Sequence, residues 1–231
     1  MDKKVNNIHE GHRQRMRNRF IETGFNGFEQ HQIVEMLLFY ACPRKDTNEL
    51  AHILIKKYGS LAGVFDASVQ ELMTVNGITE NAAVLFNMIP KCVPIYFESK
   101  TEDEVYDNTD KLKELFRPWF MGVSREEFRI ACFDNNLKLI NNRLLSDGGP
   151  SASIVDMRKL VEIVIKDKTS IIAVAHNHPT GFPIPSKEDI AVTRLINTTM
   201  KTIGVTLLDH IIVGANQVIS MKDSAFINIF E

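Results

Sequence analysis

The chain has 231 residues, of which 44% are hydrophobic and 24% are charged, and its formal net charge is −2 at pH 7. This composition excludes a disordered chain, because it provides enough apolar surface for one large core or two small ones, and it excludes a globally basic surface for nucleic acids. No apolar run approaches the roughly 18 residues of a membrane span, and no apolar signal region follows the start. We therefore expect a cytoplasmic protein without membrane contact.

Residues 1–98 have the pattern of a small all-α domain. Apolar residues recur at helical spacing in four segments, and Pro43, Gly59 and Gly77 separate these segments. The predicted helices cover residues 30–40, 47–58, 68–75 and 81–97. The polar and acidic stretch 99–110 is predicted to be a linker.

One segment of this half, residues 72–83, resembles a helix-hairpin-helix element, which binds DNA phosphates through backbone N–H groups. The usual second glycine of that element is Thr79 here, and Thr79 can also serve as a plain helix N-cap. Basic and acidic residues are equally numerous in residues 1–98, and the positive charge is concentrated at Arg13, Arg15, Arg17 and Arg19. A phosphate-binding face and an ordinary solvated face are both open interpretations.

From residue 111 to residue 231 the pattern changes to that of an α/β (α+β) domain with a mixed sheet. Runs of β-branched residues alternate with segments of helical periodicity. The predicted strands cover 128–133, 170–175 and 207–213, and the predicted helices cover 156–166 and 187–203. The cysteines at 42, 92 and 132 are widely spaced in apolar surroundings, which predicts reduced core thiols rather than disulfides.

The segment 176–189 carries the strongest indication of chemistry. His176 and His178 follow a predicted strand directly, and side chains two residues apart in an extended segment point the same way. Ser186 opens a predicted helix with Asp189 in its first turn. Two imidazoles and a carboxylate that meet there leave the fourth position of a tetrahedral zinc open, as in catalytic sites. Ser-x-x-Asp is also a capping box, but capping does not call for two histidines on the preceding strand.

These residues resemble the signature of JAB/MPN (JAMM) metalloenzymes, His-x-His-Pro, six residues, then Ser-x-x-Asp. The surrounding sequence is similar to bacterial RadC proteins over nearly the whole chain. The resemblance rests on His-Asn-His-Pro-Thr-Gly at 176–181, Pro-Ser-Lys-Glu-Asp-Ile at 185–190 and Leu-Leu-Asp-His-Ile-Ile-Val-Gly at 207–214. Two stretches depart from the family pattern: its usual Pro-Arg-Glu is Met-Arg-Lys at 157–159, and its Gly-Thr-Leu is replaced near 148–150.

The resemblance implies a glutamate at the first strand of the domain that acts as general base, and a serine that donates a hydrogen bond to the developing oxyanion. The family's Glu-x-Phe register selects Glu126 for the first role, with Glu127 on the other side of the strand. Both could instead be ordinary solvated carboxylates. The serine of the family motif is Ser186 here.

The resemblance also implies a Zn2+-dependent hydrolase acting on a protein or peptide substrate at peptide or isopeptide bonds. The alternative is a DNA-associated, repair-related protein that contacts DNA through residues 1–98 and has a structural or noncatalytic metal. An intact base and an open metal position favour the hydrolase. Asp209 and His210, within the third family motif, could orient a zinc-binding histidine or make structural hydrogen bonds.

Overall fold

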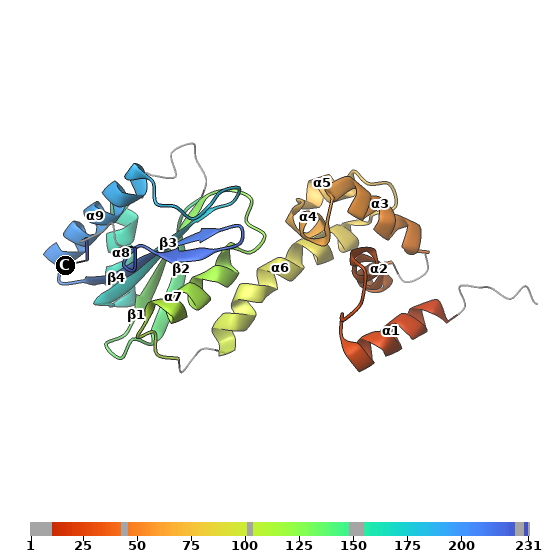
Figure 1. The fold of residues 1–231 in the computed structure, drawn as a ribbon, viewed down its shortest axis with the longest axis horizontal. Helices are drawn as coiled ribbons and strands as arrows, with labels where there is room; N and C mark the ends of the chain where they lie inside the picture. The colour runs from red at the N-terminus through yellow and green to blue at the C-terminus, as the bar shows by residue number, and fades with distance from the viewer. Residues whose placement is uncertain (1–10, 43–45, 101–103, 148–154, 225–228, 231) are drawn as a thin grey trace, which may run out of the picture. The chain divides into compact units, whose positions relative to one another are not determined.

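The computed structural model describes residues 11–42, 46–100, 104–147, 155–224 and 229–230. The chain forms two compact units, Met1–Lys91 and Cys92–Glu231 (Figure 1). The boundary between the units falls within a helix that continues to Lys100, whereas the sequence pattern places the change near residue 98. Among the helices of the described residues, none is long and apolar enough to cross a membrane.

The first unit is helical, as predicted. It contains α1 (His12–Thr23), α2 (Gln30–Ala41), α3 (Asn48–Tyr58), α4 (Leu61–Asp66), α5 (Val69–Met73) and the start of α6 (Glu80–Lys100). Its core is formed by side chains from α2 to α6, among them Val34, Leu38, Leu54, Val64, Leu72 and Phe86. The four predicted helices are confirmed as α2, α3, α5 and α6, with ends that differ by a few residues. Helix α4 was not predicted, because its six residues are too few to show a helical period.

Helix α1 is attached to α2 by the two residues that follow Gly11. His12 Nε2 lies 3.1 Å from the carboxylate of Glu35, which is buried. Arg13 donates to the Cys42 backbone oxygen at 2.9 Å and lies over the Phe39 ring, 4.8 Å from its centroid. Arg13 therefore satisfies a carbonyl at the end of α2, as basic side chains do at helix C-termini, so at least one arginine of this run has an intramolecular role.

The second unit is the predicted α+β domain. It contains α7 (Thr109–Phe116), the 3-10 helix η1 (Arg117–Phe120), β1 (Glu127–Phe133), β2 (Leu139–Asp147), α8 (Met157–Asp167), β3 (Ile171–His178), α9 (Lys187–Thr202), β4 (Thr206–Gly214) and β5 (Val218–Ser220). The sheet has the order β2-β1-β3-β4-β5, with β3 and β4 parallel and the other neighbours antiparallel (Figure 1). The three predicted strands are confirmed. The two edge strands were not predicted, because β2 is partly polar and β5 has three residues.

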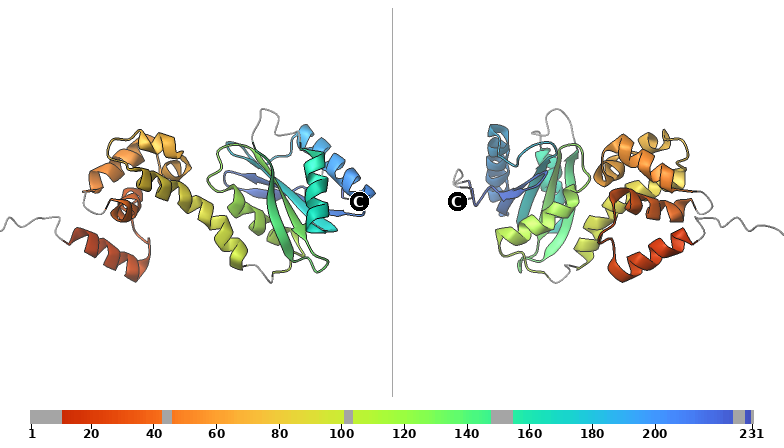
Figure 2. Two further views of the ribbon diagram at one scale, coloured as in Figure 1. Left: turned by 180° about the vertical axis from the view of Figure 1, so that it is seen from behind. Right: turned by 45° about the vertical axis from the view of Figure 1, so that its right-hand side comes forward.

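Helices cover both faces of this sheet, α8 and α9 on one face and α7 on the other (Figure 2). Successive strand residues alternate between the faces. The α8/α9 face contains Phe128, Ile130, Cys132, Ile172 and Val174, and the α7 face contains Ala131, Phe133, Ala173, Ala175 and Ile211. His176 and His178 follow Ile172 and Val174 along β3 at a spacing of two residues, so they lie on the face that α8 and α9 cover.

The cysteine prediction was right for two positions and wrong for one. Cys42 and Cys132 are buried, and burial raises the pKa of the Cys132 thiol to about 12, so this thiol stays protonated. Cys92 is exposed on α6. Residues that are adjacent in sequence point in different directions on a helix, so the apolar neighbours of Cys92 along the chain did not indicate whether Cys92 itself is buried.

Candidate metal centre

Two strand residues and one helix residue bring their ligand atoms together at the carboxyl end of β3. His176 Nε2 lies 3.0 Å from His178 Nε2 and 3.2 Å from Asp189 Oδ1, and His178 Nε2 lies 3.7 Å from Asp189 Oδ2. A tetrahedral zinc with bonds of about 2.0–2.1 Å separates its ligand atoms by about 3.3 Å. The three side chains therefore have the donor types and the spacing that fit a zinc ion. In the described part of the chain, these three form a group of His, Cys, Asp or Glu side chains with ligand atoms close enough to share a metal ion, all within 4.8 Å of one another.

The capping box and the convergence of Asp189 on the histidines occur together. Ser186 caps α9: its Oγ accepts from the Asp189 backbone N–H at 3.0 Å, while Asp189 Oδ2 accepts from the Ser186 backbone N–H at 2.7 Å and from its hydroxyl at 2.6 Å. Asp189 Oδ1 faces His176. The two sequence interpretations are therefore compatible, because one oxygen of the carboxylate holds the helix start and the other faces the site.

A chain of buried hydrogen bonds determines which nitrogen of His176 carries a hydrogen. Thr193 Oγ1 lies 2.6 Å from the Asp189 backbone oxygen, which can only accept, so the threonine hydroxyl donates there. His210 Nδ1, 2.6 Å from the same Oγ1, must then be the donor in that contact. Burial, together with the neighbouring His176, lowers the pKa of His210 well below its ordinary value, so this imidazole is neutral and its Nε2 bears a lone pair.

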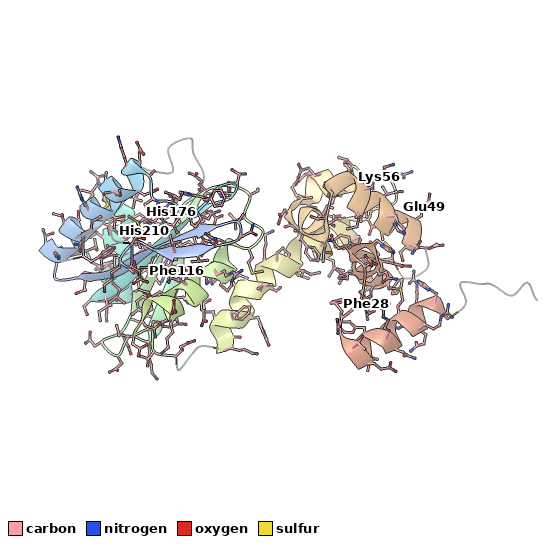
Figure 3. The ribbon with its side chains drawn as sticks, in the orientation of Figure 1. Phe28, Glu49, Lys56, Phe116, His176 and His210 are labelled. Atoms are coloured by element: carbon pink, nitrogen blue, oxygen red, sulfur yellow. The ribbon has the colours of Figure 1, made fainter. Side chains whose placement is uncertain are left out.

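The same logic extends to the site. His176 and His210 lie close together in the sheet (Figure 3). His210 Nε2 lies 2.8 Å from His176 Nδ1 and accepts its hydrogen, which leaves a lone pair on His176 Nε2. His178 Nδ1 lies 3.0 Å from the Phe182 backbone oxygen and must donate to it, so His178 Nε2 also bears a lone pair. Two nitrogen lone pairs 3.0 Å apart repel each other unless a cation lies between them.

The charge of Asp189 agrees with such a site. Burial raises the pKa of this carboxyl, but the adjacent His176 imidazole and the hydrogen bonds from Ser186 outweigh that effect and hold the pKa below its ordinary value. Asp189 is therefore ionised at neutral pH. A carboxylate and two neutral imidazoles are the ligands expected for zinc or a similar divalent cation.

The two candidate base residues lie next to each other at the start of β1. The β1–β3 register pairs Phe128 with His176. If the same alternation extended two residues back to Glu126, which lies outside β1, Glu126 would lie opposite His178 and on the same face. Glu126 is exposed and directly precedes β1, whereas Glu127 is buried, with its carboxylate 3.6 Å from Arg129 Nε.

The motif residues Asp209 and His210 have different partners. His210 belongs to the hydrogen-bond chain that ends at His176. Asp209, fully buried, accepts hydrogen bonds from its neighbour's backbone N–H, from the Ser220 hydroxyl at 2.5 Å and from the Lys222 backbone N–H at 3.1 Å. Asp209 therefore joins β4 to the segment after β5 and serves the fold.

Sequence reasoning missed two polar residues of this region. Thr193, fully buried on α9, lies one helical turn after Asp189, and that spacing is the only sequence signal that could have indicated it. Asn177, between the two histidines, is 2% exposed and bonds to the backbone of Arg125, before β1, and of Glu127, its first residue. Of the two departures from the family pattern, Met157–Lys159 begins α8 and 148–150 lie outside the described residues.

A mixed sheet with histidines at one strand end and an aspartate at the start of the adjacent helix is the arrangement of a JAB-type domain, and the sequence model of the RadC-like JAB domain family matches residues 106–226. A UPF0758 protein of Fusobacterium nucleatum is 30% identical to the chain over 226 residues, which cover 94% of the chain and 97% of that relative. A UPF0758 protein of Clostridium perfringens is 29% identical over 222 residues, which cover 95% of the chain and 96% of the relative. The chain belongs to the RadC family, as the sequence resemblance predicted.

Proposed function

We propose that this chain is a zinc-dependent hydrolase that cleaves peptide or isopeptide bonds. The observation that carries the proposal is the convergence of two Nε2 lone pairs and one carboxylate oxygen at separations of 3.0 and 3.2 Å. Three protein ligands leave a fourth coordination position open, which a structural metal does not need. His176, His178 and Asp189 would hold the ion.

Zinc bound by these ligands would supply Lewis-acid chemistry, polarising a carbonyl group and lowering the pKa of a water molecule to about 7. Glu126, which is exposed and directly precedes β1, would accept a proton from the attacking water and pass it to the leaving amine. Ser186 would donate its hydroxyl hydrogen to the oxyanion that develops from the carbonyl. That hydrogen points to Asp189 Oδ2 in the structure, so the hydroxyl must rotate for this role.

Metal analysis and a cleavage assay test this function together. The purified chain is expected to bind about one zinc ion, and His176→Ala, His178→Ala and Asp189→Ala are each expected to lose zinc and hydrolysis. His52→Ala, on α3 of the helical unit, is the matched control and should retain both. Zinc at wild-type levels in all three variants would exclude the proposed site, and zinc binding without cleavage of any peptide or isopeptide substrate would exclude the hydrolase.

DNA binding is the second candidate, supported by the hairpin between α5 and α6. Gly77 adopts a left-handed backbone conformation with φ 96°, and Thr79 caps α6 by accepting from the Ala82 backbone N–H at 3.3 Å. A turn of this kind followed by a helix N-terminus is the geometry that exposes backbone N–H groups to phosphates. The alternative explanation is an ordinary turn between two helices of the core.

A gel-shift titration of the full chain at two salt concentrations distinguishes these explanations. Phosphate contacts predict an affinity for duplex DNA that falls steeply with salt. Arg17→Ala is the better test of the arginine run, since Arg17 bonds to a surface glutamine while Arg13 holds α1 to α2. No binding at low salt would remove DNA from the partners and leave the helical unit as a candidate for protein recognition.

A further inference from the structure

Asn177 makes two hydrogen bonds that both go to the backbone beside Glu126. Its Oδ1 accepts from the Glu127 N–H at 2.7 Å, and its Nδ2 donates to the Arg125 backbone oxygen at 3.0 Å. The chemistry of the partners assigns the two ends of the carboxamide, since an N–H can only donate and a carbonyl can only accept. The side chain is 2% exposed, so water does not compete for these bonds.

The geometric consequence concerns the residue between the two partners. The Arg125 carbonyl belongs to the peptide plane before the Glu126 Cα, and the Glu127 N–H belongs to the plane after it. The orientations of these two planes define φ and ψ of Glu126 and thereby the direction of its Cα–Cβ bond. One carboxamide therefore restrains both planes at a residue that lies just outside β1.

Asn177 also connects this restraint to the metal ligands. It lies between His176 and His178 on β3, and because side chains alternate along a strand, it points to the opposite face from both. Strand β3, which carries the two imidazoles, thus restrains the Glu126 backbone through a side chain that does not occupy the face on which the reaction would take place.

We propose that Asn177 is a positioning residue that directs the Glu126 side chain toward the metal centre by clamping the two peptide planes on either side of it. The inference rests on the proposed function in that it takes Glu126 as the acid–base group. The asparagine carboxamide presents a donor and an acceptor side by side on one carbon atom, whereas an aspartate carboxylate lacks the donor and leucine lacks both.

The test uses the full chain loaded with Co2+, whose paramagnetism shifts the NMR signals of nearby protons. In Asn177→Ala, the Co2+ affinity should stay within about threefold of wild type because all three ligands remain, while the Glu127 amide should exchange about tenfold faster after losing its acceptor. The paramagnetic shift of the Glu126 side-chain methylenes should fall by about half or more as the side chain samples several directions. Asn197→Ala is the matched control, since Asn197 is a buried asparagine on α9 that bonds to the Ile229 backbone oxygen. This variant should leave the Glu126 signal unchanged.

Asn177→Asp provides a second variant that keeps the acceptor and loses the donor, and it should give an intermediate loss of the Glu126 shift. Where cleavage is measurable, Asn177→Ala should lower kcat with little change in KM. A wild-type Glu126 shift and a wild-type Glu127 exchange rate in Asn177→Ala would overturn the proposal. Loss of folding or of Co2+ binding in both variants would overturn it as well, because the carboxamide would then serve the whole domain. A wild-type chain that cleaves nothing would exclude the proposed function, whereas the NMR measurements would still decide the role of Asn177.

Discussion

Replacing Thr193 by valine should weaken zinc binding although Thr193 touches no ion. The substitution keeps the shape of the side chain and removes the hydroxyl that accepts from His210 Nδ1 at 2.6 Å. Without this acceptor, the favoured tautomer of His210 is the one with its hydrogen on Nε2, which faces His176 Nδ1 at 2.8 Å. In that tautomer His176 must carry its own hydrogen on Nε2, where the metal would bind.

The size of the effect follows from the group left without a partner. Zinc binding requires a lone pair on His176 Nε2, so the zinc-bound variant must keep a hydrogen on His210 Nδ1 that has lost its acceptor. His210 and Thr193 are both fully buried, so water cannot replace the lost acceptor. An unsatisfied buried donor costs about 1–3 kcal/mol, which corresponds to about 10–100-fold in zinc affinity, the range found when partners of metal ligands are removed.

Competition with a chromophoric chelator measures this affinity directly. Thr193→Ser retains the hydroxyl and should bind zinc within about threefold of wild type, whereas Thr193→Val should lose about 10–100-fold. Thermal melting of the metal-free proteins separates this effect from general destabilisation. Equal zinc affinities for the serine and valine variants would refute the proposed order of hydrogen bonds.

Two further predictions concern charged residues of the same unit. Glu126→Gln should abolish hydrolysis while zinc content and Tm stay near wild type. Glu127→Gln should keep activity and lower stability by about 1 kcal/mol, because Arg129 loses the charged carboxylate that lies 3.6 Å from its Nε. Inactivity of the Glu127 variant alone would show that Glu127, and not Glu126, is the base. Arg143 donates to both oxygens of Asp167, at 2.9 and 2.7 Å, and these bonds hold the pKa of Asp167 below its ordinary value. The stability gained from this pair is present at neutral pH and is lost as the pH falls through the folded pKa, so the cost of Asp167→Asn, about 1–2 kcal/mol at pH 7 in urea unfolding, should shrink below about pH 4; a cost that does not change with pH would contradict this.

The parts of the site that the sequence predicted depend on local geometry. Alternation along an extended segment places His176 and His178 on one face whatever strand lies beside them. Ser186 and Asp189 start a helix through a capping box made within four residues. The strand-then-helix order of these two motifs was enough to predict that three ligand types converge, and buried apolar runs predicted the three central strands.

Tertiary structure decided the features that depend on pairing between distant segments. Asn177 reaches Arg125 and Glu127 because β1 and β3 pair antiparallel in one register, and a shift by one residue would turn every side chain of the strand to the other face. His210 meets His176 because β4 lies parallel to β3, and Thr193 meets His210 because α9 packs on the same face of the sheet. The sequence motif drew attention to His210 but left its role open, and nothing in the sequence assigned a role to Asn177 or Thr193. The roles of all three follow from hydrogen-bond partners that only the folded sheet brings within reach.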